Sequence, residues 1–247
     1  KPITFHINGE NNADNCLETY FDIPKQVSLD YRQLGKPKPF ITIEKAKKLK
    51  ERPEETFTSL DSLFYYPYQW VFRHKVRLTK SSILSVTTDN ALLGNLAHRF
   101  IELLLKEDTN NWDKEEVEAW IDKAAPRLFA REGSTLLMYG REPERLAFLN
   151  TLKYSAWSLV SSIQQNGWTV KQTEMDLKGS FLGIPVKGKA DLVLERGDEL
   201  AVVDLKWRGS NWRKQTIKNE EDLQLVMYSK LLTPDATWAH TAYFILE

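Results

Sequence analysis

The sequence predicts an α/β fold, because amphipathic helical patterns dominate its first part and strand patterns its last part. Two β-type runs, Val186–Glu195 and Glu199–Trp207, flank Gly197-Asp198, which is typical of a hairpin with a type II′ turn. A helical segment, Glu220–Leu232, and a last strand, Thr241–Leu246, follow them. Strand, helix and strand in this order imply a parallel, right-handed crossover. The expected sheet therefore contains both a hairpin pair and a crossover pair.

Composition limits the classes of protein that need to be considered. The chain has 247 residues, of which 42% are hydrophobic, and its formal net charge is zero, so any nucleic-acid surface must be local. Its one cysteine, Cys16, excludes an internal disulfide and an all-cysteine metal site, and we expect a reducing, cytoplasmic location. No apolar run approaches membrane-spanning length and no signal peptide is visible, so we expect no membrane partner. Because the chain starts Lys1-Pro2, we expect a fragment or a processed product.

The N-terminal part divides into an expected arm or linker, residues 1–55, and the start of a domain over residues 56–247. Thr58-Ser59-Leu60-Asp61 is a plausible helix start that leads into the aromatic-rich segment Phe64–Phe72. The favoured interpretation is that these aromatic residues pack in a core. A second interpretation, in which they stack on single-stranded nucleic acid, stays open because basic residues lie among and after them. These are Arg73, His74, Lys75 and Arg77.

Three helices are expected before the strands. The first, Ala91–Lys106, contains His98, which the local pattern alone assigns to a surface or a satisfied position, and Gly94, one turn earlier. A glycine inside a helix costs about 1 kcal/mol against alanine, which suggests close approach of another element. The other two are Asp113–Arg131, expected to bend or break at its internal proline, and Glu142–Gln165. The strand that follows carries a carboxylate, Glu174, in its middle.

Two aspartates face each other across the expected hairpin. If the loop is Gly197-Asp198 alone, Asp191 falls opposite Asp204 on the same face of the sheet, and Lys206 projects from that face as well. Directly opposed Cβ atoms lie about 4.5–5.5 Å apart, so two carboxylates repel there unless a divalent cation lies between them. An acid paired with a lysine on a solvated sheet face would show the same pattern. Both interpretations remain open on the strands alone.

Oxygen-rich groups of this kind suit phosphodiester hydrolysis. Two carboxylates and a backbone carbonyl would bind Mg²⁺ or Mn²⁺, and a histidine such as His98 would favour Mn²⁺. Such an ion lowers the pKa of a bound water, and Lys206 would orient or deprotonate that water. A basic stretch after the hairpin, expected as a flexible loop, has the right charge to hold a phosphate backbone. Its basic residues are Arg208, Arg213, Lys214 and Lys218.

Four short motifs occur in a fixed order along the chain. They are Gly94-Asn95-Leu96-Ala97-His98, Gly188-Lys189-Ala190-Asp191, Asp204-Leu205-Lys206 and Gln224-Leu225-Val226-Met227-Tyr228. In this order they resemble the RecB-type nuclease branch of the PD-(D/E)xK superfamily, and four motifs in sequence are more specific than any one. The resemblance runs from roughly Thr58 to the C-terminus. It favours functional roles for His98, Gln224 and Tyr228. Their local patterns alone favour a surface or satisfied histidine, a solvated helix flank and a half-buried tyrosine.

The resemblance implies a restriction-endonuclease-like core, with a mixed central β-sheet flanked by helices, additional N-terminal helices and metal-dependent cleavage of DNA. By matching position, the protein ligands of the metal would be His98, Asp191, Asp204 and the carbonyl of Leu205. Lys206 would serve the attacking water, and Glu174 resembles an acidic residue often found on the preceding strand. Gln224 and Tyr228 would contact the DNA or brace the site.

One departure from the family concerns an iron–sulfur cluster. Some members bind a cluster through a cysteine that precedes a proline, together with three cysteines near the C-terminus. Here Tyr66 precedes Pro67, and Cys16 is the single cysteine, so a four-cysteine cluster cannot form. We expect aromatic packing over Phe64–Phe72 to stabilise the fold in place of that cluster.

The expected function is a Mg²⁺- or Mn²⁺-dependent DNA nuclease. We expect an exonuclease that acts on a threaded single strand in DNA repair or recombination, as part of a helicase–nuclease with a helicase domain or subunit as its partner. A non-catalytic, nucleic-acid-binding scaffold that keeps the fold is the alternative from another class. A structure-specific or RNA endonuclease would share the site and differ in the channel that leads to it.

Overall fold

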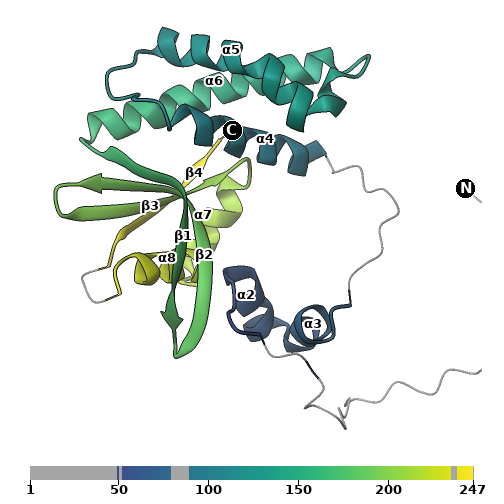
Figure 1. Ribbon diagram of the computed structural model, residues 1–247, viewed down its shortest axis with the longest axis vertical. Coiled ribbons are helices and arrows are strands. Elements are labelled where there is room, and N and C mark those ends of the chain that lie inside the picture. Colours follow the sequence, from purple (N-terminus) through teal and green to yellow (C-terminus); the bar gives the residue numbers. More distant parts are fainter. Residues whose placement is uncertain (1–48, 50–51, 79–88, 235–237, 247) are drawn as a thin grey trace, which may run out of the picture. The chain divides into compact units, whose positions relative to one another are not determined.

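The computed structural model describes residues 49, 52–78, 89–234 and 238–246, all within the unit Lys47–Glu247. The expected arm, residues 1–55, lies almost wholly outside them. The described residues form a mixed sheet with helices on both faces (Figure 1). None of the helices in these ranges is long and apolar enough to cross a membrane.

Within the described ranges the sheet has four strands in the order β1-β2-β3-β4. They are β1 (Thr169–Phe181), β2 (Ile184–Arg196), β3 (Glu199–Lys206) and β4 (His240–Ile245). The first two pairings are antiparallel and the third is parallel, so the sheet is mixed, as expected. The parallel pair β3–β4 follows from the helical crossover between these two strands.

The β2–β3 hairpin has the predicted register. Arg196 pairs with Glu199, and the ladder continues inward to Leu192 and Val203. Gly197 has a φ of 57°, and Asp198 is not among the residues with positive φ. A type II′ turn needs positive φ at its first loop residue alone, which a glycine supplies without strain.

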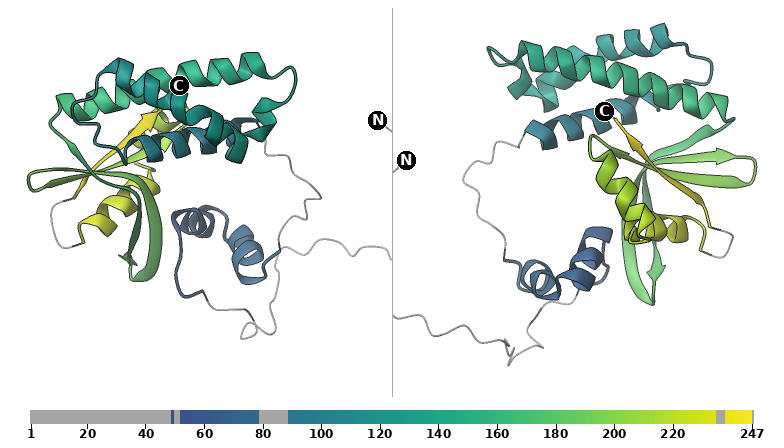
Figure 2. Two further views of the ribbon diagram at one scale, coloured as in Figure 1. Left: turned by 45° about the horizontal axis from the view of Figure 1, so that its top comes forward. Right: turned by 180° about the vertical axis from the view of Figure 1, so that it is seen from behind.

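Three helices cover one face of the sheet (Figures 1 and 2). They are α4 (Asp89–Leu104), α5 (Lys114–Glu132) and α6 (Glu142–Gln165). Helices α4 and α6 lie against the sheet, and α5 packs on these two helices. The apolar side chains of all three helices form one continuous core with Leu192, Val203 and Leu205. Of the predicted bend or break at Pro126, the break is wrong, because α5 continues through the proline and buries Ala125 and Phe129 on either side. Burial of that apolar face outweighs the one hydrogen bond that the proline removes.

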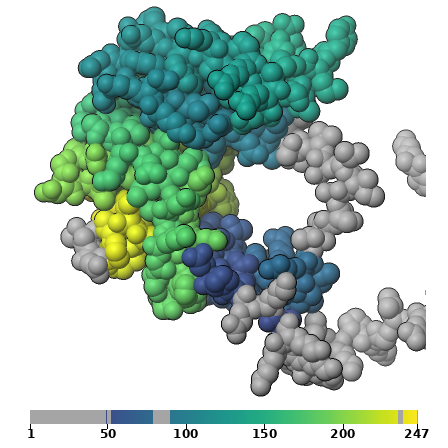
Figure 3. Space-filling model, viewed as in Figure 1, coloured from purple at the N-terminus to yellow at the C-terminus, as the bar shows by residue number. Residues whose placement is uncertain are grey.

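The other face of the sheet is covered by α8 (Leu223–Leu232) and by the start of α2 (Phe57–Tyr65). The N-cap of α2 is Thr56, whose side chain forms a capping box with Ser59, so the helix starts earlier than the predicted start at Thr58. Glu55 ties this segment to the hairpin β1–β2: its backbone N–H donates to the Pro185 carbonyl at 2.9 Å, and its carbonyl accepts from Lys187 at 2.8 Å. The space-filling view shows the dark-blue α2 segment against the green hairpin (Figure 3).

The predicted aromatic core over Phe64–Phe72 is wrong. Phe64, Tyr65, Tyr66 and Tyr68 are between 48% and 62% exposed. The cause is local, since α2 ends at Tyr65 and a new helix, α3 (Pro67–Trp70), begins at Pro67. Only the first part of α2 packs on the sheet, through Leu60, so the later aromatic side chains project from the surface. Exposed side chains of this kind do not stabilise the fold by packing, so they do not replace an iron–sulfur cluster.

The predicted basic loop is also wrong, because most of it is a helix, α7 (Ser210–Lys218). Gly209 precedes the helix with a φ of 102°, a left-handed conformation in which glycine is unstrained. Helix α7 has no buried residue, so it lacks the apolar stripe that identifies a helix in a sequence. Arg213 is half-buried, whereas Arg208, Lys214 and Lys218 are exposed.

Candidate active site

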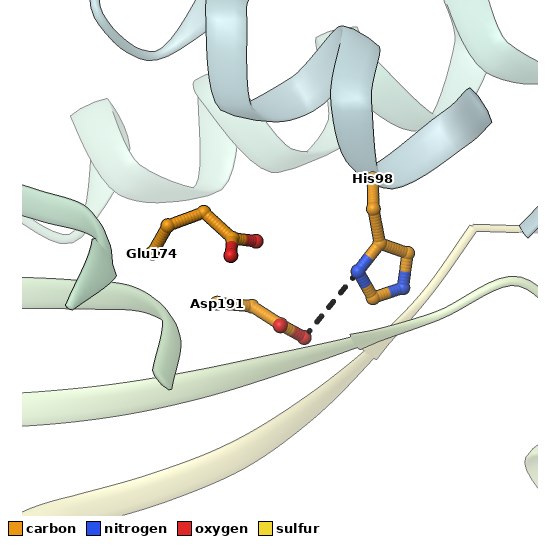
Figure 4. A group of neighbouring side chains, drawn as sticks. All are labelled: His98, Glu174 and Asp191. Carbon is orange, nitrogen blue, oxygen red and sulfur yellow. Dashed lines mark ion pairs between the residues drawn. The ribbon is translucent and has the colours of Figure 1, made fainter. Parts of the chain in front are cut away.

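Three side chains from three different elements meet beside the middle of strands β1 and β2. They are His98 of α4, Glu174 of β1 and Asp191 of β2, and their ligand atoms all lie within 4.8 Å of one another. Figure 4 shows the imidazole and the carboxylates turned toward a common point. All three are half-buried, which leaves them reachable from solvent. The sheet and the helical layer above it therefore build this cluster together.

A bend in β1 places Glu174. This residue has a φ of 52°, a left-handed conformation that is strained for a residue with a side chain. The neighbours Thr173 and Met175 keep their pairing with β2, while Glu174 itself is outside the ladder. Its carboxylate meets Lys189 Nζ at 2.9 Å. Backbone strain of about 1–3 kcal/mol persists where the surrounding structure enforces it, and such residues concentrate at functional sites.

Asp191 lies where strands β2 and β3 separate. Their ladder ends at Leu192–Val203, one step before Asp191 would pair with Asp204. Instead, the Asp191 carboxylate accepts a hydrogen bond of 2.8 Å from the backbone N–H of Leu205. The same oxygen, Oδ2, lies 3.6 Å from Nδ1 of His98. The side chain thus replaces a backbone acceptor and holds the two strands apart at the site.

The pKa of His98 lies above its ordinary value for identifiable reasons. Burial lowers the pKa, but the hydrogen-bonding contact with Asp191 and the charge of that carboxylate raise it by more. Lys206 acts in the opposite direction and Asp204 in the same direction as Asp191. The imidazole therefore lies in a negatively charged environment, which also favours a cation.

Asp204 is the most buried carboxylate of the site, with 2% of its surface exposed. Burial raises its pKa to about 6, although the nearby Lys206 ammonium lowers it. Nζ of Lys206 lies 2.5 Å from Oδ2 of Asp204, yet that oxygen has no aligned hydrogen-bond donor among the described residues. Asp204 is not in the group formed by His98, Glu174 and Asp191. It faces the other side of the site, toward Lys206 and α8.

A hydrogen-bonded chain connects Asp204 to α8 and β4. Nε2 of Gln224 donates to Oδ1 of Asp204 at 2.5 Å. The hydroxyl of Tyr243 lies 3.5 Å from Oε1 of Gln224 and donates to Asp222 at 3.1 Å. Burial raises the pKa of Tyr243, so its hydroxyl stays protonated at neutral pH. Gln224 is thus fixed with its amide group against Asp204.

A family model describes this arrangement of elements and motifs over most of the chain. The model of the PD-(D/E)XK nuclease superfamily matches residues 56–246. The chain belongs to the PD-(D/E)XK nuclease superfamily. It is therefore a nuclease by family, a class of hydrolases that use divalent metals. No curated protein matches the chain significantly.

The residues of this PD-(D/E)XK nuclease suit the divalent metal that the family uses. His98, Glu174 and Asp191 supply one nitrogen and two carboxylates within mutual reach. Across the site, the buried Oδ2 of Asp204 has the Lys206 ammonium as its neighbour at 2.5 Å, and a metal would take the place of that cation. Carboxylate oxygens with one imidazole are ligands that Mn²⁺ and Mg²⁺ accept.

The residues expected to contact nucleic acid differ in their burial. Gln224 and Tyr228 are buried beside the site. Arg213 reaches toward it: its guanidinium lies 4.2 Å from the Trp212 ring centroid and 4.7 Å from that of Tyr243. Arg208 and Lys214 are exposed, and Arg208 lies 3.4 Å from the Asn90 side chain.

Two residues beside the site of this nuclease lie outside the motifs. Tyr243 was predicted only as part of a strand, and Asp222 was placed inside a helix that in fact begins after it. Asp222 caps α8 by accepting from the Leu225 N–H at 3.0 Å. An Asp directly before an apolar helical run is a cap signal, so Asp222 could have been found. No local pattern signals the contact of Tyr243 with Gln224.

The glycine of the G-x-x-D motif has a packing role. A Cβ atom at Gly188 would lie 2.6 Å from Cε1 of Tyr228, whereas one at Gly94 would lie 3.5 Å from Cβ of Trp207. The first distance is a clash and the second an ordinary contact, so the close approach predicted at Gly94 leaves room for a methyl group. Tyr228 therefore lies directly on the backbone of β2, three residues before Asp191.

We expect Gly188→Ala to lower the free energy of unfolding by about 1–3 kcal/mol, because the Tyr228 ring must move. Gly94→Ala is the matched control, and it should keep or slightly raise stability because alanine favours a helix by about 1 kcal/mol. Urea unfolding of both variants measures the difference. Equal stability of the two variants would contradict the packing role of Gly188.

Proposed function

We propose that the protein is a Mg²⁺- or Mn²⁺-dependent deoxyribonuclease of the RecB type. In this proposal it is an exonuclease on single-stranded DNA, acting in repair or recombination as the nuclease module of a helicase–nuclease. The observation that carries the proposal is the meeting of His98, Glu174 and Asp191 beside a buried Asp204–Lys206 pair. Metal-dependent phosphodiester hydrolysis needs acidic side chains that hold the metal ion and positive charge that stabilises the phosphate beside it.

Each residue receives a role from its position. His98, Asp191, Asp204 and the Leu205 carbonyl would hold the metal, with Glu174 as a further carboxylate. The bound ion would supply positive charge to the phosphate and lower the pKa of a water molecule. Lys206, held against Asp204, would turn to orient that water or to neutralise a phosphate oxygen. Gln224 holds Asp204 in place through the hydrogen bond between them.

Support for a nucleic-acid strand comes from the cavity beside Lys206. Lys187, Lys189, Lys206 and Arg213 line it, against the single acid Asp176. Each of the three lysines has an acidic partner, Glu54, Glu174 or Asp204, so the cations compete between these acids and a phosphate. The basic lining suits a phosphate backbone, and the whole chain has a net charge of zero. A neutral chain fits a module that receives its strand from a helicase domain or subunit better than a solitary tight binder. The single cysteine fits the reducing cytoplasm.

The test is cleavage of end-labelled single-stranded DNA, duplex DNA and RNA, each with Mg²⁺, Mn²⁺ or EDTA. We expect metal-dependent shortening of single-stranded DNA from an end, and loss of activity with EDTA and in Lys206→Ala. Cleavage that continues in EDTA would contradict the metal role. Cleavage of the end-labelled DNA at internal positions would contradict the exonuclease, and preference for RNA would contradict the substrate.

The Asp204–Lys206 ion pair also favours a second candidate, a nucleic-acid-binding scaffold that keeps the fold. In a scaffold the lysine would neutralise the buried acid permanently, and no ion would be needed. Titration of the purified protein with Mn²⁺ separates the two functions. Saturable binding near one or two ions per chain, lost in Asp191→Asn, supports the enzyme, and no binding supports the scaffold.

A further inference from the structure

A second cavity lies between α2 and α7 and collects exposed aromatic side chains. Its volume is about 410 Å³, within the range of about 300–1,000 Å³ that is usual for small-ligand sites. Tyr65, Tyr66 and Trp212 line it and are 57%, 62% and 60% exposed. Large aromatic side chains that gather at one cavity while remaining solvent-exposed are a feature of binding surfaces. None of the roles given above to the active-site residues uses these three rings.

This aromatic cavity is continuous with the active site. Phe57 and Arg213 line both the aromatic cavity and the neighbouring cavity that contains Lys206 and Gln224. Arg213 lies at the junction, stacked on Trp212 and donating a hydrogen bond of 3.2 Å to the Tyr243 hydroxyl. A strand with a phosphate beside Lys206 would therefore pass Arg213 to reach the aromatic rings.

The two cavities differ in charge. The one beside Lys206 is basic, whereas among the described residues the aromatic cavity is lined by three acids, Asp61, Glu221 and Asp222, and one cation, Arg213. Carboxylates repel a phosphate, but they accept hydrogen bonds from the exocyclic amino groups of bases, as acidic side chains do with cytosine N4. The aromatic cavity is thus suited to a base, and the basic cavity to the backbone that carries it.

We propose that the aromatic cavity is a base-stacking subsite for single-stranded nucleic acid, which takes an unpaired base with an exocyclic amino group. The strand that carries this base continues past Arg213 to the phosphate beside Lys206. The proposal rests on the proposed function for the identity of the ligand, and it adds a subsite and a base preference. A duplex cannot use the subsite without unstacking a base.

Stacking of one base on an aromatic side chain contributes about 1–3 kcal/mol to binding, so its loss weakens affinity about 5- to 150-fold. We expect this loss for Trp212→Ala on a labelled oligo-dC strand, measured by fluorescence anisotropy of the full chain in EDTA, where cleavage is blocked. Trp212→Phe keeps an aromatic face and should bind close to the wild-type affinity. Trp238→Ala is the matched control, because Trp238 is also 60% exposed and lies outside the cavity. It should leave binding unchanged.

Further measurements test the specific parts of the proposal. Oligo-dC should bind more tightly than oligo-dT, which lacks an exocyclic amino group, and Asp61→Asn should reduce that preference. Equal binding of the two oligomers by the wild type would overturn the base preference. A loss in Trp212→Ala that is as large on blunt duplex as on single strands would overturn the unpaired-base subsite, as would wild-type affinity of Trp212→Ala for oligo-dC.

The outcome for the subsite is separable from the outcome for catalysis. If the wild type cleaves DNA but Trp212→Ala binds single strands normally, the subsite is wrong and the nuclease proposal stands. If Trp212→Ala weakens binding but the wild type cleaves nothing with either metal, the subsite stands and the catalytic proposal fails.

Discussion

Asp191→Asn is expected to reduce the rate of DNA cleavage by at least about 100- to 1,000-fold, the usual cost of removing one electrostatic contact from an active site. The carboxylate of Asp191 lies between His98 and the backbone of Leu205, so it serves the site and the strand separation together. An asparagine can still accept the hydrogen bond from the Leu205 N–H through its carbonyl oxygen. Only the negative charge is lost, and the fold should remain.

Single-turnover cleavage of end-labelled single-stranded DNA in Mn²⁺ measures this effect. Asp198→Asn is the matched control, because Asp198 belongs to the same hairpin, loses the same charge and is exposed at the turn. Mn²⁺ titration of both variants should show weaker binding in Asp191→Asn alone. A cleavage rate for Asp191→Asn within a few fold of the control would exclude Asp191 from the metal site.

Asp204→Asn is expected to make the metal-free protein more stable while it removes activity. Burial raises the pKa of Asp204 from 3.8 to about 6 in the folded protein. Below pH 3.8 the carboxyl group is protonated in both the folded and the unfolded chain, so its burial does not lower the free energy of unfolding through a buried charge. As the pH rises through about 6, the folded chain must hold a buried charge that the unfolded chain exposes to water. The cost approaches about 3 kcal/mol at pH 8, at about 1.4 kcal/mol for each pKa unit.

The stability difference between Asp204→Asn and the wild type should therefore be small at pH 4 and reach about 3 kcal/mol in favour of the variant at pH 8. Urea unfolding in EDTA at both pH values measures it. Added Mn²⁺ should stabilise the wild type and have less effect on the variant, because a bound ion stabilises the folded state alone. A variant less stable than the wild type at pH 8 would mean that Lys206 fully compensates the buried charge.

The hairpin and its register were predictable because a side-chain period of two and a Gly-Asp loop leave little freedom. Arg196 pairs with Glu199 as predicted, and the match over residues 56–246 confirms the PD-(D/E)XK nuclease superfamily, whereas the RecB branch stays a prediction. The structure differs from the prediction where the regular pairing of β2 with β3 ends. The sequence placed Asp191 directly opposite Asp204, but the strands separate one step earlier and Asp191 binds a backbone N–H instead. Which residues of the site bind metal stays a prediction.

Other features depended on contacts that local patterns do not encode. Helix α7 was predicted as a loop because it buries no side chain, so it has no apolar period. The aromatic residues after Leu63 were predicted as core because their composition is apolar, yet the chain turns at Pro67 and leaves them exposed. Tyr243 joins the site through a hydrogen bond from a distant strand. Such pairings are set by the whole sheet.

The left-handed backbone at Glu174 has a consequence for anyone who engineers this protein. Glycine is the residue that this conformation tolerates best, and it would relieve strain of about 1–3 kcal/mol. A library selected only for heat resistance would thus be expected to enrich glycine at position 174 and to discard the carboxylate that meets His98 and Asp191. The selected variants would be more stable than the parent protein and would lack one carboxylate ligand for a cation. Directed evolution of this chain therefore needs a selection that monitors cleavage in every round.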